Sequence, residues 1–238
     1  SSFIELLDRL RTDRVTPKDV QVWNSRHDPH FDPTFEPDVI HLTTTNKSAQ
    51  ARNDYELNQL PGKIWKLKAH TIGELPDRRM PSEELLTLKE GARIMFTLND
   101  PDRRWVNGTL GTISRIHKKG LSKLPALEVE LVDGKEVIVT PFKWEMFEYQ
   151  HDGTSIEESV VGSYTQYPIT LAWAVTIHKA QGKTFDRVLV DIGWGTFAHG
   201  QLYVALSRCT TFNGLVLLKP FRTKDVILDQ AVVEFMNR

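Results

Sequence analysis

Polar and basic side chains that could bind phosphate groups gather in two short segments of the sequence. Each segment follows a run of β-branched and apolar residues, and together they contain Thr43, Thr44, Asn46, Thr176, His178 and Lys179. Hydroxyl, imidazole and ammonium donors at a strand-to-helix turn can hold successive phosphates of a nucleic-acid strand, assisted by nearby backbone amides. By residue type alone, the same side chains could equally cap a helix or face solvent. They are candidates for a nucleic-acid site.

A second group of residues could contact a nucleotide, and it contains Gln181, Gly182, Lys183 and Arg208. Gly182-Lys183-Thr184 matches the tail of a phosphate-binding P-loop, but Ile177 stands where that pattern requires its first glycine. Asp191, at the end of an apolar run, imitates a magnesium-binding aspartate without a second acid beside it. We therefore expect no complete phosphate cradle in this chain, and no nucleotide bound by the chain alone.

Arg208 closes a helix predicted over residues 201–208. The opposite face of this helix is apolar, and an unpaired guanidinium turned toward a core is costly to desolvate. We therefore expect Arg208 to face a cleft or solvent. The alternative role is that of a cation favoured by the dipole at a helix C-terminus.

The elements that would position these residues belong to an α/β fold. Helices are predicted over 3–12 and from Pro17, capped by Thr16, to Trp23, and the spacing favours a third helix after Asn46. That third helix should bury the pattern Ala51, Tyr55, Leu57 and Leu60. Buried strands are predicted over 39–45, 169–174, 187–192 and 215–218, and a last helix should use Val226, Leu228, Val232 and Phe235.

The middle of the chain follows a different pattern, in which short alternating strands replace the α/β order. Strands are predicted over 91–96 and 109–116, followed by a hairpin in which 127–132 and 135–140 flank the turn Asp133-Gly134. Several short strands in succession indicate a small β-barrel, with 153–158 as its exit linker. The predicted domains are residues 1–87 and 154–238 for the α/β part and 88–153 for the insertion.

Composition excludes several classes of protein. The chain has 238 residues, a net charge of −1, one cysteine (Cys209) and 40% hydrophobic residues, so disorder and a disulfide framework are excluded. No apolar run is long enough to span a bilayer, and no secretory leader opens the sequence, so we expect a cytoplasmic protein. His27 and His30 lie among prolines without a clustered third ligand, so no metal site is expected. The missing initiator Met suggests a piece of a longer protein.

Four stretches together resemble one family. They read LTTTN at 42–46, VNGTLGTI at 106–113, LAWAVTIHKAQGKT at 171–184 and QLYVALSR at 201–208. In this order and spacing they are similar to the motifs of superfamily 1 helicases of the RecD/Pif-like group. The resemblance implies a second RecA-like motor domain that is interrupted by a small SH3-like β-barrel.

The same resemblance implies a function and a set of roles. The chain would be the C-terminal motor half of a 5′→3′ helicase on single-stranded DNA, acting in repair or recombination and tolerating RNA hybrids. ATP and Mg²⁺ would be held in the full-length protein with an upstream RecA-like domain that carries the P-loop. Arg208 would be the arginine finger, with Gln181, Gly182 and Lys183 at the nucleotide, and the six residues of the two segments would bind DNA.

Two other readings remain open from the residues. One is a stand-alone nucleic-acid- or protein-binding module with no ATPase role, and the near-zero net charge mildly favours a protein partner. The other is a stand-alone P-loop NTPase that uses Gly182-Lys183-Thr184 and Asp191. The missing first glycine argues against the second of these.

Overall fold

The computed structural model describes residues 2–33, 36, 38–73, 80–118, 124–151, 156–193 and 200–226. The chain divides into two compact units, one made of residues 1–56 and 172–238 and the other of residues 57–171. The insertion therefore lies between two halves of the first unit, as the change of pattern along the sequence indicated. None of the helices in the described segments has the length and the hydropathy that crossing a bilayer requires.

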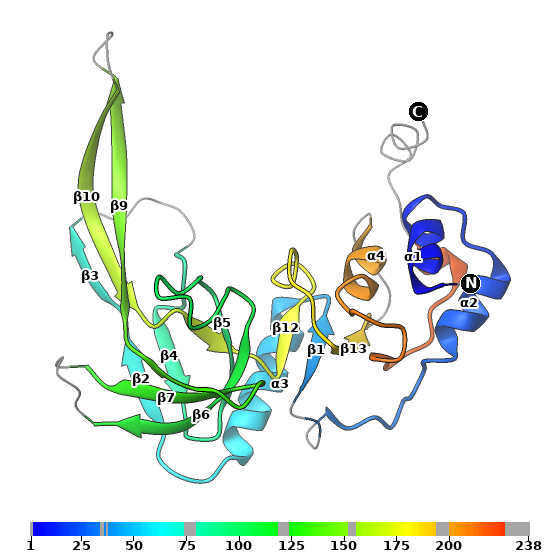
Figure 1. The fold of residues 1–238 in the computed structure, drawn as a ribbon, viewed down its shortest axis with the longest axis horizontal. Helices are drawn as coiled ribbons and strands as arrows, with labels where there is room; N and C mark the ends of the chain where they lie inside the picture. The colour runs from blue at the N-terminus through cyan, green and yellow to red at the C-terminus, as the bar shows by residue number, and fades with distance from the viewer. Residues whose placement is uncertain are drawn as a thin grey trace. The chain divides into compact units, whose positions relative to one another are not determined.

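A parallel sheet forms the centre of the first unit (Figure 1). Its strand order is β12-β1-β13-β14, and the bounds are Ala174–Thr176 for β12, Val39–Thr43 for β1, Arg187–Asp191 for β13 and Leu215–Leu217 for β14. All three neighbouring pairs run parallel, and every residue of β1 is buried. Continuous burial suits a parallel strand that is covered on both faces. The predicted parallel α/β arrangement is present.

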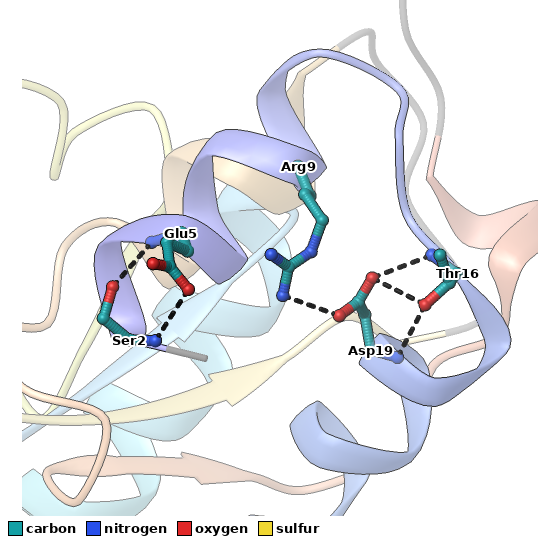
Figure 2. Close-up of polar contacts among 5 residues, drawn as sticks. All are labelled: Ser2, Glu5, Arg9, Thr16 and Asp19. Carbon is teal, nitrogen blue, oxygen red and sulfur yellow. Dashed lines mark hydrogen bonds and ion pairs between the residues drawn. The ribbon is translucent and has the colours of Figure 1, made fainter.

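Helices of this unit begin where their capping residues stand. They are α1 (Phe3–Arg11), α2 (Pro17–Asn24), α3 (Asn46–Gln59, whose last residues pass into the second unit) and α4 (Gln201–Leu206), with a 3₁₀ turn at Thr223–Asp225. Ser2 with Glu5 and Thr16 with Asp19 each form a reciprocal capping box, which Figure 2 shows. The predicted helix that contains Leu228, Val232 and Phe235 lies outside the described residues.

The buried face of α3 differs from the predicted one. Ala51 and Tyr55 are exposed, whereas Asn53 and Glu56 are buried. The prediction counted apolar residues only, but these two polar side chains find partners inside the unit. Asn53 bonds to the backbone of Ala174, and Glu56 pairs with Arg52 one turn earlier. Satisfied polar groups can replace apolar ones on a buried helix face.

The second unit is built from antiparallel sheets. A five-stranded sheet has the order β11-β5-β6-β7-β8, beside a three-stranded sheet β3-β10-β9 and the pair β2-β4. The bounds are β2 Trp65–Lys68, β3 His70–Gly73, β4 Leu85–Leu88, β5 Arg93–Phe96, β6 Leu110–His117, β7 Ala126–Leu131, β8 Glu136–Val139, β9 Phe142–His151, β10 Ile156–Gln166 and β11 Ile169–Leu171. The β7–β8 hairpin is confirmed, and Gly134 at its turn has a φ of +82°.

Three boundaries differ from the prediction. The unit extends beyond 88–153, because β2, β3 and the first three residues of β4 precede that range and all of β10 and β11 follow it. Of the predicted linker 153–158, residues 156–158 belong to β10, while 153–155 lie outside the described residues. The strand predicted over 169–174 is two strands: β11 pairs with β5, whereas β12 pairs with β1. Hydropathy could not show this break, because both halves are buried and apolar.

Candidate functional site

The two predicted phosphate-binding segments meet at the carboxyl edge of the parallel sheet. β1 and β12 are neighbours, with Thr43 opposite Thr176, and the amide of Ile177 donates to the carbonyl oxygen of Thr43 at 2.9 Å. Figure 1 shows these strands, from opposite ends of the sequence, side by side. Loops that leave the carboxyl ends of adjacent parallel strands commonly line a ligand site. The register thus brings residues 43–46 and 176–179 together in one unit.

The threonines of this edge shape its loops. Thr43 is 1% exposed and its hydroxyl donates to the carbonyl oxygen of Thr45 at 3.1 Å. Thr176 is 5% exposed, and its hydroxyl accepts the amide of Lys179 at 3.3 Å. Sequence analysis placed both side chains at the surface as phosphate ligands, but both are buried. Their hydroxyls therefore hold the loop conformation, while Thr44, the next residue after β1, is half-buried.

Asn46 and His178 supply the exposed groups of the edge. The sequence offered Asn46 as a helix cap, but the cap is Thr45, whose hydroxyl accepts the amide of Ser48 at 3.1 Å. Asn46 is the first residue of α3, and its exposed carboxamide is not used for capping. The His178 ring is exposed and has no hydrogen-bond partner in the part of the chain that the structure describes. Both can reach a ligand.

Beneath this edge lies a histidine that the sequence analysis did not single out. His41 in β1 lies between Ala174 and Leu189 in the strand register, and it is 8% exposed. Burial lowers the pKa of His41 to about 4, against an opposing effect of Asp191. Neither ring nitrogen has a hydrogen-bond partner among the described residues. The ring is therefore neutral near pH 7 and belongs to the sheet interior.

The predicted nucleotide segment, residues 181–183, contains a tight turn at Gly182. Gly182 has a φ of +73°, and open space surrounds the position that a Cβ would occupy. Lys183 is half-buried, its ammonium donates to the carbonyl oxygen of Lys179 at 2.8 Å, and burial lowers its pKa. No helix follows Thr184, because β13 starts at Arg187, so the geometry of a P-loop is not formed here. Gln181 is exposed beside it.

Asp191, the second imitation of a nucleotide motif, has a local structural role. Its carboxylate accepts the amide of Gly193 at 2.8 Å, where the chain turns at the end of β13. An aspartate that accepts an amide two residues ahead forms an ordinary Asx turn. The contact gives Asp191 a role in the turn that does not require a metal ion.

Arg208 lies beside the nucleotide segment and uses its guanidinium internally. Nε donates to the carbonyl oxygen of Val204 at 2.9 Å, Nη1 to that of Lys183 at 2.9 Å and Nη2 to the Ser207 hydroxyl at 2.8 Å. The side chain is half-buried, so it is not turned into the core, and the three hydrogen bonds hold it against the end of the loop. Neutral oxygens at the end of α4 satisfy the donors, which makes partial burial inexpensive.

The register and these bonds place Gln181, Gly182, Lys183 and Arg208 next to one another. The amide of Phe185 donates to the carbonyl oxygen of Arg208 at 2.8 Å, which ties the end of α4 to the loop after Lys183. Residues 177–180 connect Thr176, at the carboxyl end of β12, to Gln181. The candidate segments 176–179 and 181–183 are therefore parts of one continuous turn.

Sequence reasoning missed Asn53, the buried residue of α3 that contacts β12. Its carboxamide donates to the carbonyl oxygen of Ala174 at 2.8 Å and accepts the amide of Ala174 at 2.8 Å. In the sequence Asn53 is one of several polar residues in a polar helix, and no spacing distinguishes it. Only the fold shows that it is buried.

Comparisons with known proteins agree with this geometry. Residues 171–216, which include the turn and α4, match the model of the UvrD-like helicase C-terminal domain. ATP-dependent DNA helicase Pif1 of Campylobacter jejuni is 32% identical over 228 residues, which cover 86% of this chain and 49% of that protein.

Solved structures extend the similarity to nearly the whole fold. The Pif1 of a Bacteroides species, in complex with ADP-AlF4, superposes with a TM-score of 0.85 at 29% identity, covering 99% of this chain and 53% of that one. Its structure bound to ssDNA superposes with a TM-score of 0.74 over the same shares. The chain thus spans about half the length of these relatives. These matches and the fold identify the chain as a C-terminal part of a superfamily 1 helicase of the Pif1-like family.

Proposed function

We propose that this chain is the C-terminal motor half of an ATP-dependent translocase that moves 5′→3′ along single-stranded DNA. The observation that carries the proposal is the pairing of Thr43 with Thr176, which brings two phosphate-binding segments to one sheet edge. The relative from Bacteroides has been solved with ssDNA and with ADP-AlF4, which supports both ligands. In this proposal the first unit, residues 1–56 and 172–238, is the motor domain, and the second unit, residues 57–171, contains the SH3-like insertion that the sequence placed at 88–153.

Single-stranded DNA lies along the carboxyl edge of β1 and β12 in this proposal. Asn46 and His178 donate to successive phosphates, Lys179 adds charge, and the buried Thr43 and Thr176 keep the loops in place. Thr44 adds a half-buried hydroxyl at the end of β1. Backbone amides at the start of α3 add donors at a helix N-terminus. The result is a track for phosphates that does not read base sequence.

The residues near Arg208 fit contact with a nucleotide, but not its complete binding. Gly182 leaves its backbone open, and the Arg208 donors rest on neutral oxygens that an anionic phosphate can replace. The phosphate cradle and Mg²⁺ would be supplied by an upstream RecA-like domain of the same protein. ATP hydrolysis supplies the free energy of movement. Arg208 stabilises charge on the transferring phosphoryl group as an arginine finger, and Gln181 and Lys183 lie beside it.

In this proposal the turn of residues 176–183 couples nucleotide binding near Arg208 to DNA binding at the sheet edge. Because Lys183 bonds to the carbonyl oxygen of Lys179, a shift of the nucleotide segment is transmitted to the DNA segment. Alternating grip by 43–46 and 176–179 then becomes a step along the strand.

Fluorescence anisotropy with a labelled oligothymidylate tests the proposal on the 238-residue chain. We expect weak binding whose log–log salt slope is about −0.7 for each phosphate neutralised. A parallel phosphate-release assay should detect no ATP hydrolysis, since no cradle for the phosphates is present. Tight, salt-insensitive binding would favour a stand-alone binding module. DNA-stimulated hydrolysis that disappears in Lys183→Ala would favour a stand-alone NTPase.

A further inference from the structure

Asn53 covers the outer edge of β12 in the parallel sheet. Among the described residues β12 pairs with β1 alone, and the bonds of Trp173 and Ile177 to β1 turn the alternate residue, Ala174, away from it. The Asn53 carboxamide meets both outward-facing backbone groups of Ala174, each at 2.8 Å. Asn53 is 7% exposed and Ala174 is 1% exposed. The edge of β12 is therefore closed by one side chain.

The two partners of this contact each lead to one half of the proposed DNA track. Asn53 lies seven residues, or about two helical turns, after Asn46 at the start of α3. Ala174 lies two residues before Thr176, in the strand that delivers His178. The contact thus joins the element behind residues 43–46 to the element behind residues 176–179.

A carboxamide suits this position because it carries one donor and one acceptor in a planar group, as a peptide does. A carboxylate offers acceptors only, and an aliphatic side chain would leave the amide and carbonyl of Ala174 buried without partners. Leu or Met would fill a helix face as well as Asn53 does. The buried Asn therefore indicates that this position serves the paired hydrogen bonds to Ala174 rather than apolar packing.

We propose that Asn53 is a positioning residue for single-stranded DNA. It holds α3 and β12 at a fixed spacing, so that residues 43–46 and 176–179 bind one strand as a single unit. This inference rests on the proposed function, because it needs the two segments to bind the same strand. Asn53 does not touch DNA and acts through His178 and its neighbours.

A double-mutant cycle in DNA affinity tests the inference, with anisotropy of a labelled oligothymidylate on the 238-residue chain. Asn53→Ala should weaken binding about ten-fold, as should His178→Ala, whereas the double variant should lose much less than the product. Asn58→Ala is the matched control, because Asn58 lies on the same helix and is exposed. It should bind like the unmodified chain.

Asn53→Asp keeps the test valid if Asn53→Ala fails to fold. The carboxylate accepts the amide of Ala174 but repels its carbonyl oxygen, whereas the protonated acid offers both a donor and an acceptor. Its affinity relative to the unmodified chain should therefore recover as the pH is lowered toward 5. The affinity is measured per folded molecule, with the folded fraction followed by circular dichroism at each pH, and a residue that only adds stability would then show no such recovery.

The outcomes distinguish failure of this inference from failure of the proposed DNA-binding function. If His178→Ala weakens binding but folded Asn53→Ala binds normally, or if the two losses multiply independently, Asn53 does not position the track. If neither variant loses affinity, the DNA track itself is misplaced, and the inference fails with it.

Discussion

Two arginines of the first unit use their guanidinium groups internally, but with partners of different kinds. Arg9 of α1 donates to the Asp19 carboxylate at 2.8 Å, and Thr16 donates to the same carboxylate (Figure 2). Arg208 at the end of α4 donates to two backbone carbonyl oxygens and one hydroxyl, all of them neutral. The first is an ionic contact between two helices, and the second is a set of replaceable hydrogen bonds.

The difference determines which arginine can serve a ligand. Separating Arg9 from Asp19 would leave a buried carboxylate without its cation, which is strongly unfavourable. Moving Arg208 exposes only neutral oxygens, and a phosphate offers it stronger, charge-assisted bonds. Under the proposed function, Arg9 of α1 therefore serves stability and Arg208, two residues beyond the end of α4, serves the nucleotide. The first two predictions below test this contrast between the arginines. The third makes the same comparison for two lysines, one bonded internally and one with no hydrogen-bond partner in the described part of the chain.

Loss of Arg208 should have the largest effect, in the protein that joins this chain to its P-loop domain. Arg208→Ala should reduce DNA-stimulated ATP hydrolysis about a hundred-fold or more, because charge on the transferring phosphoryl group is left uncompensated. This loss corresponds to an increase of at least ~2.7 kcal/mol in the activation free energy. Arg208→Lys should restore little, since an ammonium lacks the planar fork. Steady-state phosphate release measures both.

Arg9→Ala is the matched control for that experiment, and it should lower thermal stability while leaving turnover per folded molecule near normal. Arg208→Ala should also cost some stability, because three internal hydrogen bonds disappear. DNA affinity without nucleotide should stay unchanged. Near-normal ATP turnover in folded Arg208→Ala would contradict the functional role of Arg208 and leave both arginines with a structural role.

The ionic contact of Asp19 should appear as acid sensitivity. Burial opposes ionisation of Asp19, but the Arg9 guanidinium and the Thr16 donors outweigh it and lower the pKa to about 2. A depressed carboxyl pKa adds stability above its unfolded value, and that stability is lost as pH falls from about 4 through 2. The shift corresponds to about 2 kcal/mol. Asp19→Asn should lose this amount at neutral pH and show a flatter acid profile in urea unfolding.

Asp8→Asn is the control for the acid profile. Asp8 pairs with Arg11 and Arg14 on the surface, and a hydrogen bond from Arg11 lowers its pKa despite a small opposing effect of desolvation. Because Asp8 is exposed to solvent, its removal should matter less than that of Asp19. Equal effects of the two variants would show that the buried contact is not special.

The smallest effect concerns two lysines of the turn. The Lys183 ammonium is bound to the carbonyl oxygen of Lys179, whereas the Lys179 ammonium has no hydrogen-bond partner among the described residues. Lys179→Gln should weaken single-stranded DNA binding several-fold and reduce the salt slope by about 0.7. Lys183→Gln should leave the slope unchanged. Anisotropy titrations at several salt concentrations measure both, and equal slopes for the two variants would contradict the distinction.

Local structure followed from the sequence wherever neighbours in the chain determine it. Thr16 and Pro17 predicted the start of α2, and Asp133-Gly134 predicted the β7–β8 hairpin, because caps and two-residue turns depend on a few consecutive residues. The parallel strands were readable for the same reason, from short β-branched runs. The motifs at 42–46 and 171–208 were likewise sufficient for the family.

Tertiary structure alone decided which of these residues are buried, which are exposed and which bond to one another. Asn53 and Ala174 are 121 positions apart, and Arg208 meets Lys183 across 25 positions, so no local pattern contains either contact. The sequence by itself determined β1, β13, β14, the tight turns and the chemistry present at the sheet edge, but not the break between β11 and β12. The fold determined that Thr43 and Thr176 lie buried, that Asn46 and His178 are exposed, and that Arg208 rests on neutral oxygens. The physical reason is that a buried polar group needs a partner, and here the partners come from distant parts of the chain.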